Sequence, residues 1–147
     1  MLYPIGIQNF EKIRTGGFVY VDKTALIYSL AASGQYYFLS RPRRFGKSLL
    51  VSTMEAYFSG RKELFGGLAM ESLEKEWTEY PVLHLDLTGA AYLSVDELYS
   101  KLNSFLSKYE ERYEIRTVEH VASVRFENII DTAYRKTGQK VVILIDE

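Results

Sequence analysis

The most informative part of the chain is a basic turn with the sequence Arg41-Pro42-Arg43-Arg44-Phe45-Gly46-Lys47-Ser48. It follows a short aromatic run, Tyr36 to Ser40, which we expect to form a strand, and it precedes a helix predicted from Leu49 to Ser59. A turn that ends in Gly-Lys-Ser directs backbone N–H groups and the start of a helix at an anion. The turn therefore predicts a phosphate site between a strand and a helix.

The residue types of this turn suit a triphosphate with its metal ion. Gly46 lets the backbone approach the phosphates closely. The Lys47 side chain is expected to reach the β- and γ-phosphates, because a cation at a helix start opposes the helix dipole unless an anion is present. The Ser48 hydroxyl is expected to bind Mg²⁺, unless it is an ordinary first-turn serine. The predicted nucleotide-binding residues are Arg43, Arg44, Phe45, Gly46, Lys47, Ser48 and Leu49.

The arginines of the turn have alternative interpretations. Arg43 and Arg44 could contact phosphate or a neighbouring subunit, or they could be solvated loop residues. The sequence leaves these alternatives open.

A second motif lies at the other end of the chain, where the apolar run Val141 to Ile145 is followed by Asp146 and Glu147. About a hundred residues separate Lys47 from Asp146, a usual distance when two motifs sit at the carboxyl ends of parallel strands. Asp146 is predicted to hold the metal through its water shell, and Glu147 to polarise the attacking water as a catalytic base. The alternative is an acidic pair at an exposed strand end.

The rest of the chain alternates between helical and extended patterns, which predicts a parallel sheet covered by helices. A strand is expected from Val82 to Leu87, with His84 and Asp86 on one face. These two side chains could flank a site, or form a satisfied polar pair beneath a helix or loop. The predicted helices run from Lys23 to Ala32 after the capping residue Asp22, onward from the capping box Ser94/Glu97, and from Val124 to Lys136.

Composition narrows the class of protein. The chain has 147 residues, 47% of them hydrophobic, which predicts one domain with a sizeable core. The formal net charge of −1 argues against a general nucleic-acid or membrane binder, although positive charge is bunched locally at the turn. There is no cysteine, no leader sequence and no run long enough to cross a bilayer, so we expect a cytoplasmic protein.

With these residues in place, the chain resembles the bacterial AAA-ATPase-like family. The resemblance rests on Tyr3 to Phe10, Phe18 to Thr24, Tyr36 to Ser48 and the terminal acidic strand. It implies a P-loop NTPase with an α/β fold, in which helices cover both faces of a parallel sheet in three layers. It also implies ATP and Mg²⁺ as ligands. Longer members carry a C-terminal nuclease-like domain of the PD-(D/E)XK type, which is an implied partner.

Two departures qualify this resemblance. Arg41 stands where the usual phosphate turn has its first glycine, and Pro42 offers no N–H, so the entrance to the turn must differ. In ATPases with adjacent Asp and Glu residues, a strand from later in the sequence lies between the phosphate-turn strand and the acidic strand. We therefore expect residues 1–147 to be the N-terminal part of an ATPase domain. Residues 1–35 would be an extension, and residues 36–147 would run from the Walker A turn to the Walker B strand.

The function expected from the sequence is ATP binding and Mg²⁺-dependent ATP hydrolysis in the full-length protein, with this chain alone a weak binder. One alternative is a nucleotide-dependent switch or scaffold that does not hydrolyse ATP. A nucleic-acid-binding module that uses the arginines is a third reading, and oligomeric state is left open. The apolar segment from Tyr3 to Phe10 could supply the wall of a base pocket.

Overall fold

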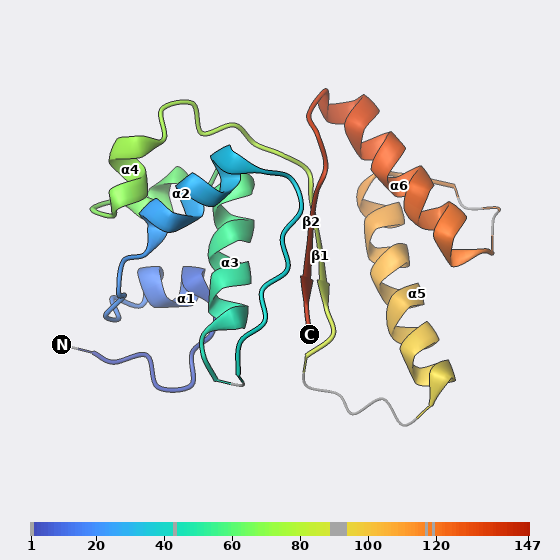
Figure 1. Ribbon diagram of the computed structural model, residues 1–147. Coiled ribbons are helices and arrows are strands. Elements are labelled where there is room, and N and C mark those ends of the chain that lie inside the picture. The colour runs from blue at the N-terminus through green and yellow to red at the C-terminus, as the bar shows by residue number, and fades with distance from the viewer. Residues whose placement is uncertain (1, 43, 89–93, 117, 119) are drawn as a thin grey trace. The chain divides into compact units, whose positions relative to one another are not determined.

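The computed structural model describes residues 2–42, 44–88, 94–116, 118 and 120–147. Its backbone forms two compact units, Met1–Glu79 and Tyr80–Glu147. In Figure 1 the first unit runs from blue to green and the second from yellow-green to red. Each unit has a buried hydrophobic cluster of its own.

The first unit is built from helices. They are α1 (Phe10–Thr15), α2 (Thr24–Ser33), α3 (Lys47–Phe58), the 3₁₀-helix η1 (Lys62–Phe65) and α4 (Ala69–Leu73). Aromatic rings fill its core: the ring centre of Phe65 lies 4.9 Å from that of Phe10 and 5.2 Å from that of Trp77. The single tryptophan therefore packs against this core.

Most helices predicted for this unit are confirmed, with small shifts at their ends. The predicted helix from Lys23 to Ala32 is α2, and the one from Leu49 to Ser59 is α3, which begins two residues earlier at Lys47. The short elements η1 and α4 follow them. The sequence did not predict α1, which is only six residues long and is capped by Asn9, whose side chain accepts from the Lys12 N–H at 2.9 Å.

Asp22 ties the starts of two helices together. One carboxylate oxygen, Oδ1, accepts from the N–H of Thr24 at 2.8 Å and from its hydroxyl at 2.7 Å, at the start of α2. The other, Oδ2, accepts from the Ala69 N–H at 2.7 Å, at the start of α4. The buried Thr24 hydroxyl in turn accepts from the Met70 N–H at 3.0 Å. The predicted capping residue thus serves two helices.

The strand predicted from Tyr36 to Ser40 is wrong for this structure. The segment is extended chain without strand pairing, and the Tyr36 and Phe38 side chains are 93% and 86% exposed. The Tyr37 hydroxyl instead donates to the Leu30 carbonyl oxygen at 2.7 Å, at the end of α2. A strand requires a neighbouring backbone, and within the described part of this unit the only ladder contact is the bridge between Leu2 and Phe18.

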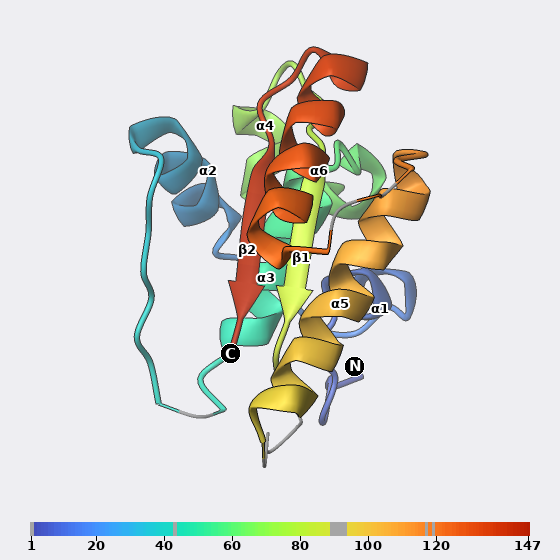
Figure 2. The same cartoon turned by 90° about the vertical axis from the view of Figure 1, so that its right-hand side faces the viewer.

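The second unit is mixed α/β. Strands β1 (Val82–Asp86) and β2 (Val142–Asp146) pair in parallel, with Val82 opposite Val142 and Asp86 opposite Asp146. The helices α5 (Val95–Arg112) and α6 (Ala122–Thr137) lie side by side on one face of these strands, as Figures 1 and 2 show from two directions. The predicted strands and the predicted C-terminal helix are confirmed to within one or two residues.

The helices of this unit are fixed by a core and by a buried ion pair. Leu83 of β1 packs with Phe105 and Ile129. The Arg125 guanidinium donates Nε–H to Glu110 Oε1 at 2.8 Å and Nη2–H to Oε2 at 2.7 Å, which joins α6 to α5. Both side chains are nearly buried, so the two-pronged geometry offsets their desolvation. The predicted cap of α5 is also observed, since the Ser94 hydroxyl accepts from the Glu97 N–H.

The outer edge of β1 is occupied by a side chain. The Pro81 carbonyl and the Leu87 N–H bond to β2. Because the backbone groups of successive residues in a strand point to opposite edges, the His84 N–H points away from β2. That N–H donates to the hydroxyl oxygen of Tyr109 at 2.8 Å. Tyr109 belongs to α5 and is 1% exposed.

The described residues thus form a mixed α/β structure with a small parallel sheet, in agreement with part of the predicted fold class. The sheet has two strands in the described part of the chain, and the predicted three-layer arrangement stays a prediction. None of the helices within the described ranges has both the length and the apolar character needed to cross a membrane.

We expect Asp22→Ala to lower the free energy of unfolding by about 1 to 2 kcal/mol, because it removes caps from two helices. Partial burial acts to raise the pKa of Asp22, but the hydrogen bonds from Ala69 and Thr24 outweigh it and lower that pKa. The stabilisation is therefore complete above the unfolded-state pKa, about 3.9, and disappears as the pH falls through the lower folded-state value.

Urea unfolding of wild type and Asp22→Ala at several pH values measures this difference. Glu76→Ala is the control, since Glu76 is an exposed carboxylate of the same unit. A difference between the two variants that persists undiminished at the lowest pH would contradict the role of the ionised carboxylate.

Candidate functional site

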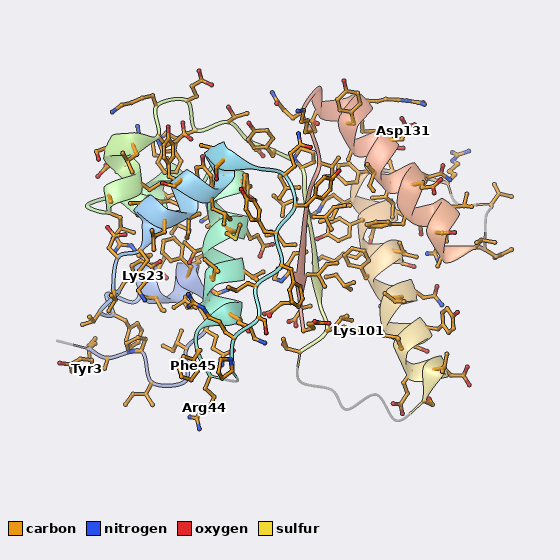
Figure 3. The ribbon with its side chains drawn as sticks, in the orientation of Figure 1. Tyr3, Lys23, Arg44, Phe45, Lys101 and Asp131 are labelled. Atoms are coloured by element: carbon orange, nitrogen blue, oxygen red, sulfur yellow. The ribbon has the colours of Figure 1, made fainter. Side chains whose placement is uncertain are left out.

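Two residues of the basic turn have a left-handed backbone. Arg44 and Gly46 both have left-handed conformations, with φ of 69° and 75°. Figure 3 labels Arg44 and Phe45 in this turn, next to the start of α3. A left-handed arginine is strained by about 1 kcal/mol, and such strain is often found where a turn serves a binding site. Arg43, one of the predicted contacts, lies outside the described residues.

The first amides of α3 are available to a ligand. The first intrahelical hydrogen bond runs from the Leu50 N–H to the Gly46 carbonyl at 3.0 Å. The N–H groups of Lys47, Ser48 and Leu49 precede it, and no side chain caps this helix. Within the described part of the chain, no acceptor bonds to these three N–H groups, which lie at the positive end of the dipole of a 12-residue helix.

The positive charge of Lys47 at the start of α3 also favours an anion there. Lys47 is the first residue of the helix, its first turn contains no acidic residue, and in the described residues its ammonium group forms no ion pair. A cation at the positive end of a helix dipole is unfavourable in the absence of a counter-charge. A phosphate group would offset this unfavourable charge and accept hydrogen bonds from the free N–H groups.

The position of α3 is fixed by the core of the first unit. Leu49 and Leu50 pack against the buried cluster, so the helix cannot roll away from its turn. The Ser52 hydroxyl accepts from the Phe10 N–H at 2.9 Å, which brings the start of α1 to the second turn of α3. The exposed apolar side chains Tyr3 and Ile5 precede this contact, in the segment predicted to line a base pocket.

A cavity of about 210 Å³ lies elsewhere on the first unit, beside α1, α3 and η1. Its lining residues are Asn9, Glu11, Ser52, Glu55, Ala56, Ser59, Arg61 and Leu64. Arg61 already forms an ion pair with Glu11 at 2.9 Å. Because Glu11 and Glu55 would repel a phosphate, the turn is the better anion site of the two.

The second unit carries the acidic residues at the carboxyl ends of its strands. Asp146 is the last residue of β2 and is buried, whereas Glu147 follows it and is exposed. Asp86 ends β1 directly opposite Asp146 in the strand register. Residues paired in this way have side chains on the same face of the sheet, so the two carboxylates are neighbours.

Asp86 is held in a fixed orientation. Its Oδ1 accepts from the Thr88 N–H at 2.8 Å and from the Thr88 hydroxyl at 2.6 Å. Partial burial acts to raise the pKa of the Asp86 carboxyl, but the Thr88 hydrogen bonds and the charges of His84 and Lys101 outweigh it and lower that pKa. The side chain is therefore ionised at neutral pH.

The structure brings the predicted site residues together in two groups. Arg44, Phe45, Gly46, Lys47, Ser48 and Leu49 lie around the turn of the first unit, and Asp146 and Glu147 lie at the end of β2 in the second. The pairing of Asp86 with Asp146 was not predicted. The signal for it was present, since Val82 to Asp86 and Val142 to Asp146 are both runs of five residues that end in aspartate.

Any metal ion at these residues would have few protein ligands. Within the described ranges, no group of three or more His, Cys, Asp or Glu side chains is placed to hold a metal. Mg²⁺ in phosphate-binding proteins commonly has one or two carboxylates together with substrate phosphates and water. The hydroxyl of Ser48 and the carboxylate of Asp146 are oxygen ligands of the type that this ion prefers.

Comparisons with known proteins found relatives of nearly the whole chain. The sequence profile of a family described as "Predicted AAA-ATPase" matches residues 4–147. The "Uncharacterized protein in vnfD 5'region" of Azotobacter chroococcum mcd 1 is 39% identical over 146 residues. The match covers 98% of this chain and 28% of the length of that relative. No solved structure matches the chain.

We expect Gly46→Ala to weaken the binding of tripolyphosphate much more than it weakens the fold. A Cβ at Gly46 would meet no protein atom within 4 Å, so its cost to the fold is the left-handed backbone alone, about 1 kcal/mol. The same Cβ would project into the space where an anion is expected. Gly67→Ala is a matched control, because Gly67 also has a positive φ and open surroundings.

Calorimetric titration with tripolyphosphate and thermal unfolding of both variants make this comparison. Equal losses of stability with a loss of binding only in Gly46→Ala are expected. Unchanged binding in Gly46→Ala would show that the anion does not approach this backbone.

Arg44→Gly tests whether Arg44 contacts phosphate. Because glycine adopts the left-handed conformation without strain, the variant is expected to match or exceed the wild type in stability, by up to about 1 kcal/mol. Loss of the guanidinium should nevertheless weaken tripolyphosphate binding, as the same titration would show. Undiminished affinity would show that Arg44 does not contact the phosphate.

Proposed function

Because the chain belongs to the family described as predicted AAA-ATPase, we propose that it binds Mg²⁺·ATP at the basic turn and hydrolyses ATP in the full-length protein. The observation that carries this proposal is the uncapped start of α3, where amide donors and the Lys47 ammonium face no acceptor among the described residues. A cytoplasmic location is part of the proposal and fits a chain without cysteine.

The turn would hold the triphosphate. The N–H groups from Phe45 to Leu49 would donate to the phosphate oxygens, and Lys47 would offset their charge on the β- and γ-phosphates. Arg43 and Arg44 would add charge at the entrance of the turn. This arrangement depends on geometry rather than on covalent chemistry, as is usual for phosphoryl transfer.

Ser48 and Asp146 would hold the magnesium ion, Asp146 through water. When bound, the ion would offset negative charge on the phosphates. Both residues fit this role: in the described part of the chain, neither the Ser48 hydroxyl nor the Asp146 carboxylate has a hydrogen-bond partner.

Glu147 would act on the attacking water. The exposed carboxylate directly follows Asp146, so it would reach a water molecule beside the metal site. It would accept a proton as the water oxygen bonds to the γ-phosphorus, while the bond from that phosphorus to the β–γ bridging oxygen breaks. The products are ADP and inorganic phosphate.

We expect Lys47→Ala to weaken Mg²⁺·ATP binding by about 10- to 100-fold, because it removes a charged hydrogen bond worth about 1.5 to 3 kcal/mol. Calorimetric titration of wild type and variant measures this ratio. Lys62→Ala, which removes an exposed lysine of the same unit, should bind as wild type does. Equal affinity in all three proteins would refute the assignment of the turn.

We expect Glu147→Gln in the full-length protein to bind ATP normally and to lose phosphate release, so that ATP stays bound. A phosphate-release assay and recovery of the bound nucleotide test this result. Wild type that binds ATP and releases no phosphate would instead identify a nucleotide-dependent switch. Binding that falls steeply with salt and ignores ATP would indicate a nucleic-acid module.

A further inference from the structure

The segment that follows α4 is fastened to α3 although it forms neither helix nor strand. Residues 74–79, which we call the strap, are the last part of the first unit. The Glu74 carboxylate anchors the strap: Oε2 accepts from the Tyr57 hydroxyl at 2.6 Å, and Oε1 accepts from the N–H groups of Lys75 and Glu76 at 2.8 and 2.9 Å. Because Tyr57 belongs to α3, one carboxylate joins the strap to the helix that starts at the basic turn.

Trp77 joins the strap to the core of the first unit. The centre of its ring system lies 6.1 Å from the ring centre of Tyr57 and 5.2 Å from that of Phe65. It packs against the same buried cluster as Leu49 and Leu50, which lie in the first turn of α3. The strap and the start of α3 therefore depend on one core.

Two features of Trp77 act against the closed position of the strap. Its backbone is left-handed, with φ of 49°, which is strained for a bulky side chain. Its indole N–H is buried and has no hydrogen-bond acceptor among the described residues, which is also unfavourable. Both costs would disappear on opening, because the backbone could relax and water could accept from the indole N–H. The Glu74 hydrogen bonds and the ring packing thus hold the strap closed against two local penalties.

We propose that the strap is a conformational switch that opens away from α3, and that an anion bound at the start of α3 keeps it closed. With the strap open, the cluster lacks Trp77, so Leu49 and Leu50 are held less firmly and the start of α3 binds an anion more weakly. Because such coupling is reciprocal, the bound anion favours the closed strap. The coupling rests on the proposed function, since the anion is the triphosphate assigned to the turn.

The switch would act on the chain that leaves the first unit. The strap ends at the boundary between the two units, and β1 follows it in the sequence. A closed strap restrains this connection at its first-unit end, and an open strap lengthens the free connection. Occupation of the turn would thereby change the freedom of the chain that enters β1.

The test measures hydrogen exchange of the Trp77 indole N–H by NMR on the 147-residue chain, in which Trp77 is the single tryptophan and gives one indole signal. Tyr57→Phe removes the hydroxyl that donates to Glu74 and retains the ring, so exchange should be about 10-fold faster, as expected for the loss of a hydrogen bond to a charged group. Glu74→Gln removes the charge from the other partner and should also speed exchange.

Tyr28→Phe is the matched control. Tyr28 packs against the same cluster, and its hydroxyl has no hydrogen-bond partner among the described residues, so the variant should exchange at the wild-type rate. The backbone amide of Thr53, a buried residue of α3, should keep its wild-type rate in all these variants. That result distinguishes opening of the strap from unfolding of the unit.

Tripolyphosphate tests the coupling. At saturation it should slow exchange of the wild-type indole N–H by about 5-fold or more, the usual lower range for coupled sites. Lys47→Ala, which weakens the proposed anion site, should show little slowing at the same concentration.

The outcomes separate this inference from the proposed function. Wild-type indole exchange in both Tyr57→Phe and Glu74→Gln, or equal acceleration in Tyr28→Phe or at the Thr53 amide, overturns the strap. Tripolyphosphate that binds in calorimetry but leaves indole exchange unchanged overturns the coupling and leaves the proposed function in place. A chain that binds no tripolyphosphate overturns the assignment of the turn and the coupling with it, whereas faster exchange in Tyr57→Phe would still support an opening strap.

Discussion

The start of α3 is the constraint on which the site depends. A helix that begins at a left-handed glycine, without a side-chain cap, has unpaired amides and a positive dipole end. Asn9 and Ser94 supply acceptors to α1 and α5, but no described side chain caps α3, which adds a lysine at its first residue. The local instability is tolerated because Leu49, Leu50 and the Ser52 contact hold the helix in the core.

The acidic pair at the ends of β1 and β2 is positioned by strand pairing. Strand pairing sets Asp86 and Asp146 at one level, and the helices α5 and α6 hold the strands through Leu83 and the Glu110–Arg125 ion pair. Backbone register determines positions to within one residue, whereas a loop would not. Each of the two groups of residues is therefore positioned by a rigid element of its own unit.

Much of the helical structure could be predicted from the sequence, because caps and apolar spacing are local signals. Ser94 and Gly138 mark the ends of helices in the sequence and in the structure. The aromatic run from Tyr36 to Ser40 was misleading, since strand formation depends on a partner that local sequence does not reveal. The residues of the turn are predicted from their motif alone, and their role stays a prediction. Asp86 needed the register, which is a long-range property.

The hydroxyl of Tyr109 has a consequence for how the sheet can grow. By accepting from the His84 N–H, it uses one of the backbone donors on the outer edge of β1. On β2, the backbone N–H and C=O groups of Ile143 and Ile145 point away from β1. The side chains of these two residues are partly exposed. An incoming strand on the outer border of β1 would therefore lack a hydrogen bond that the tyrosine already uses.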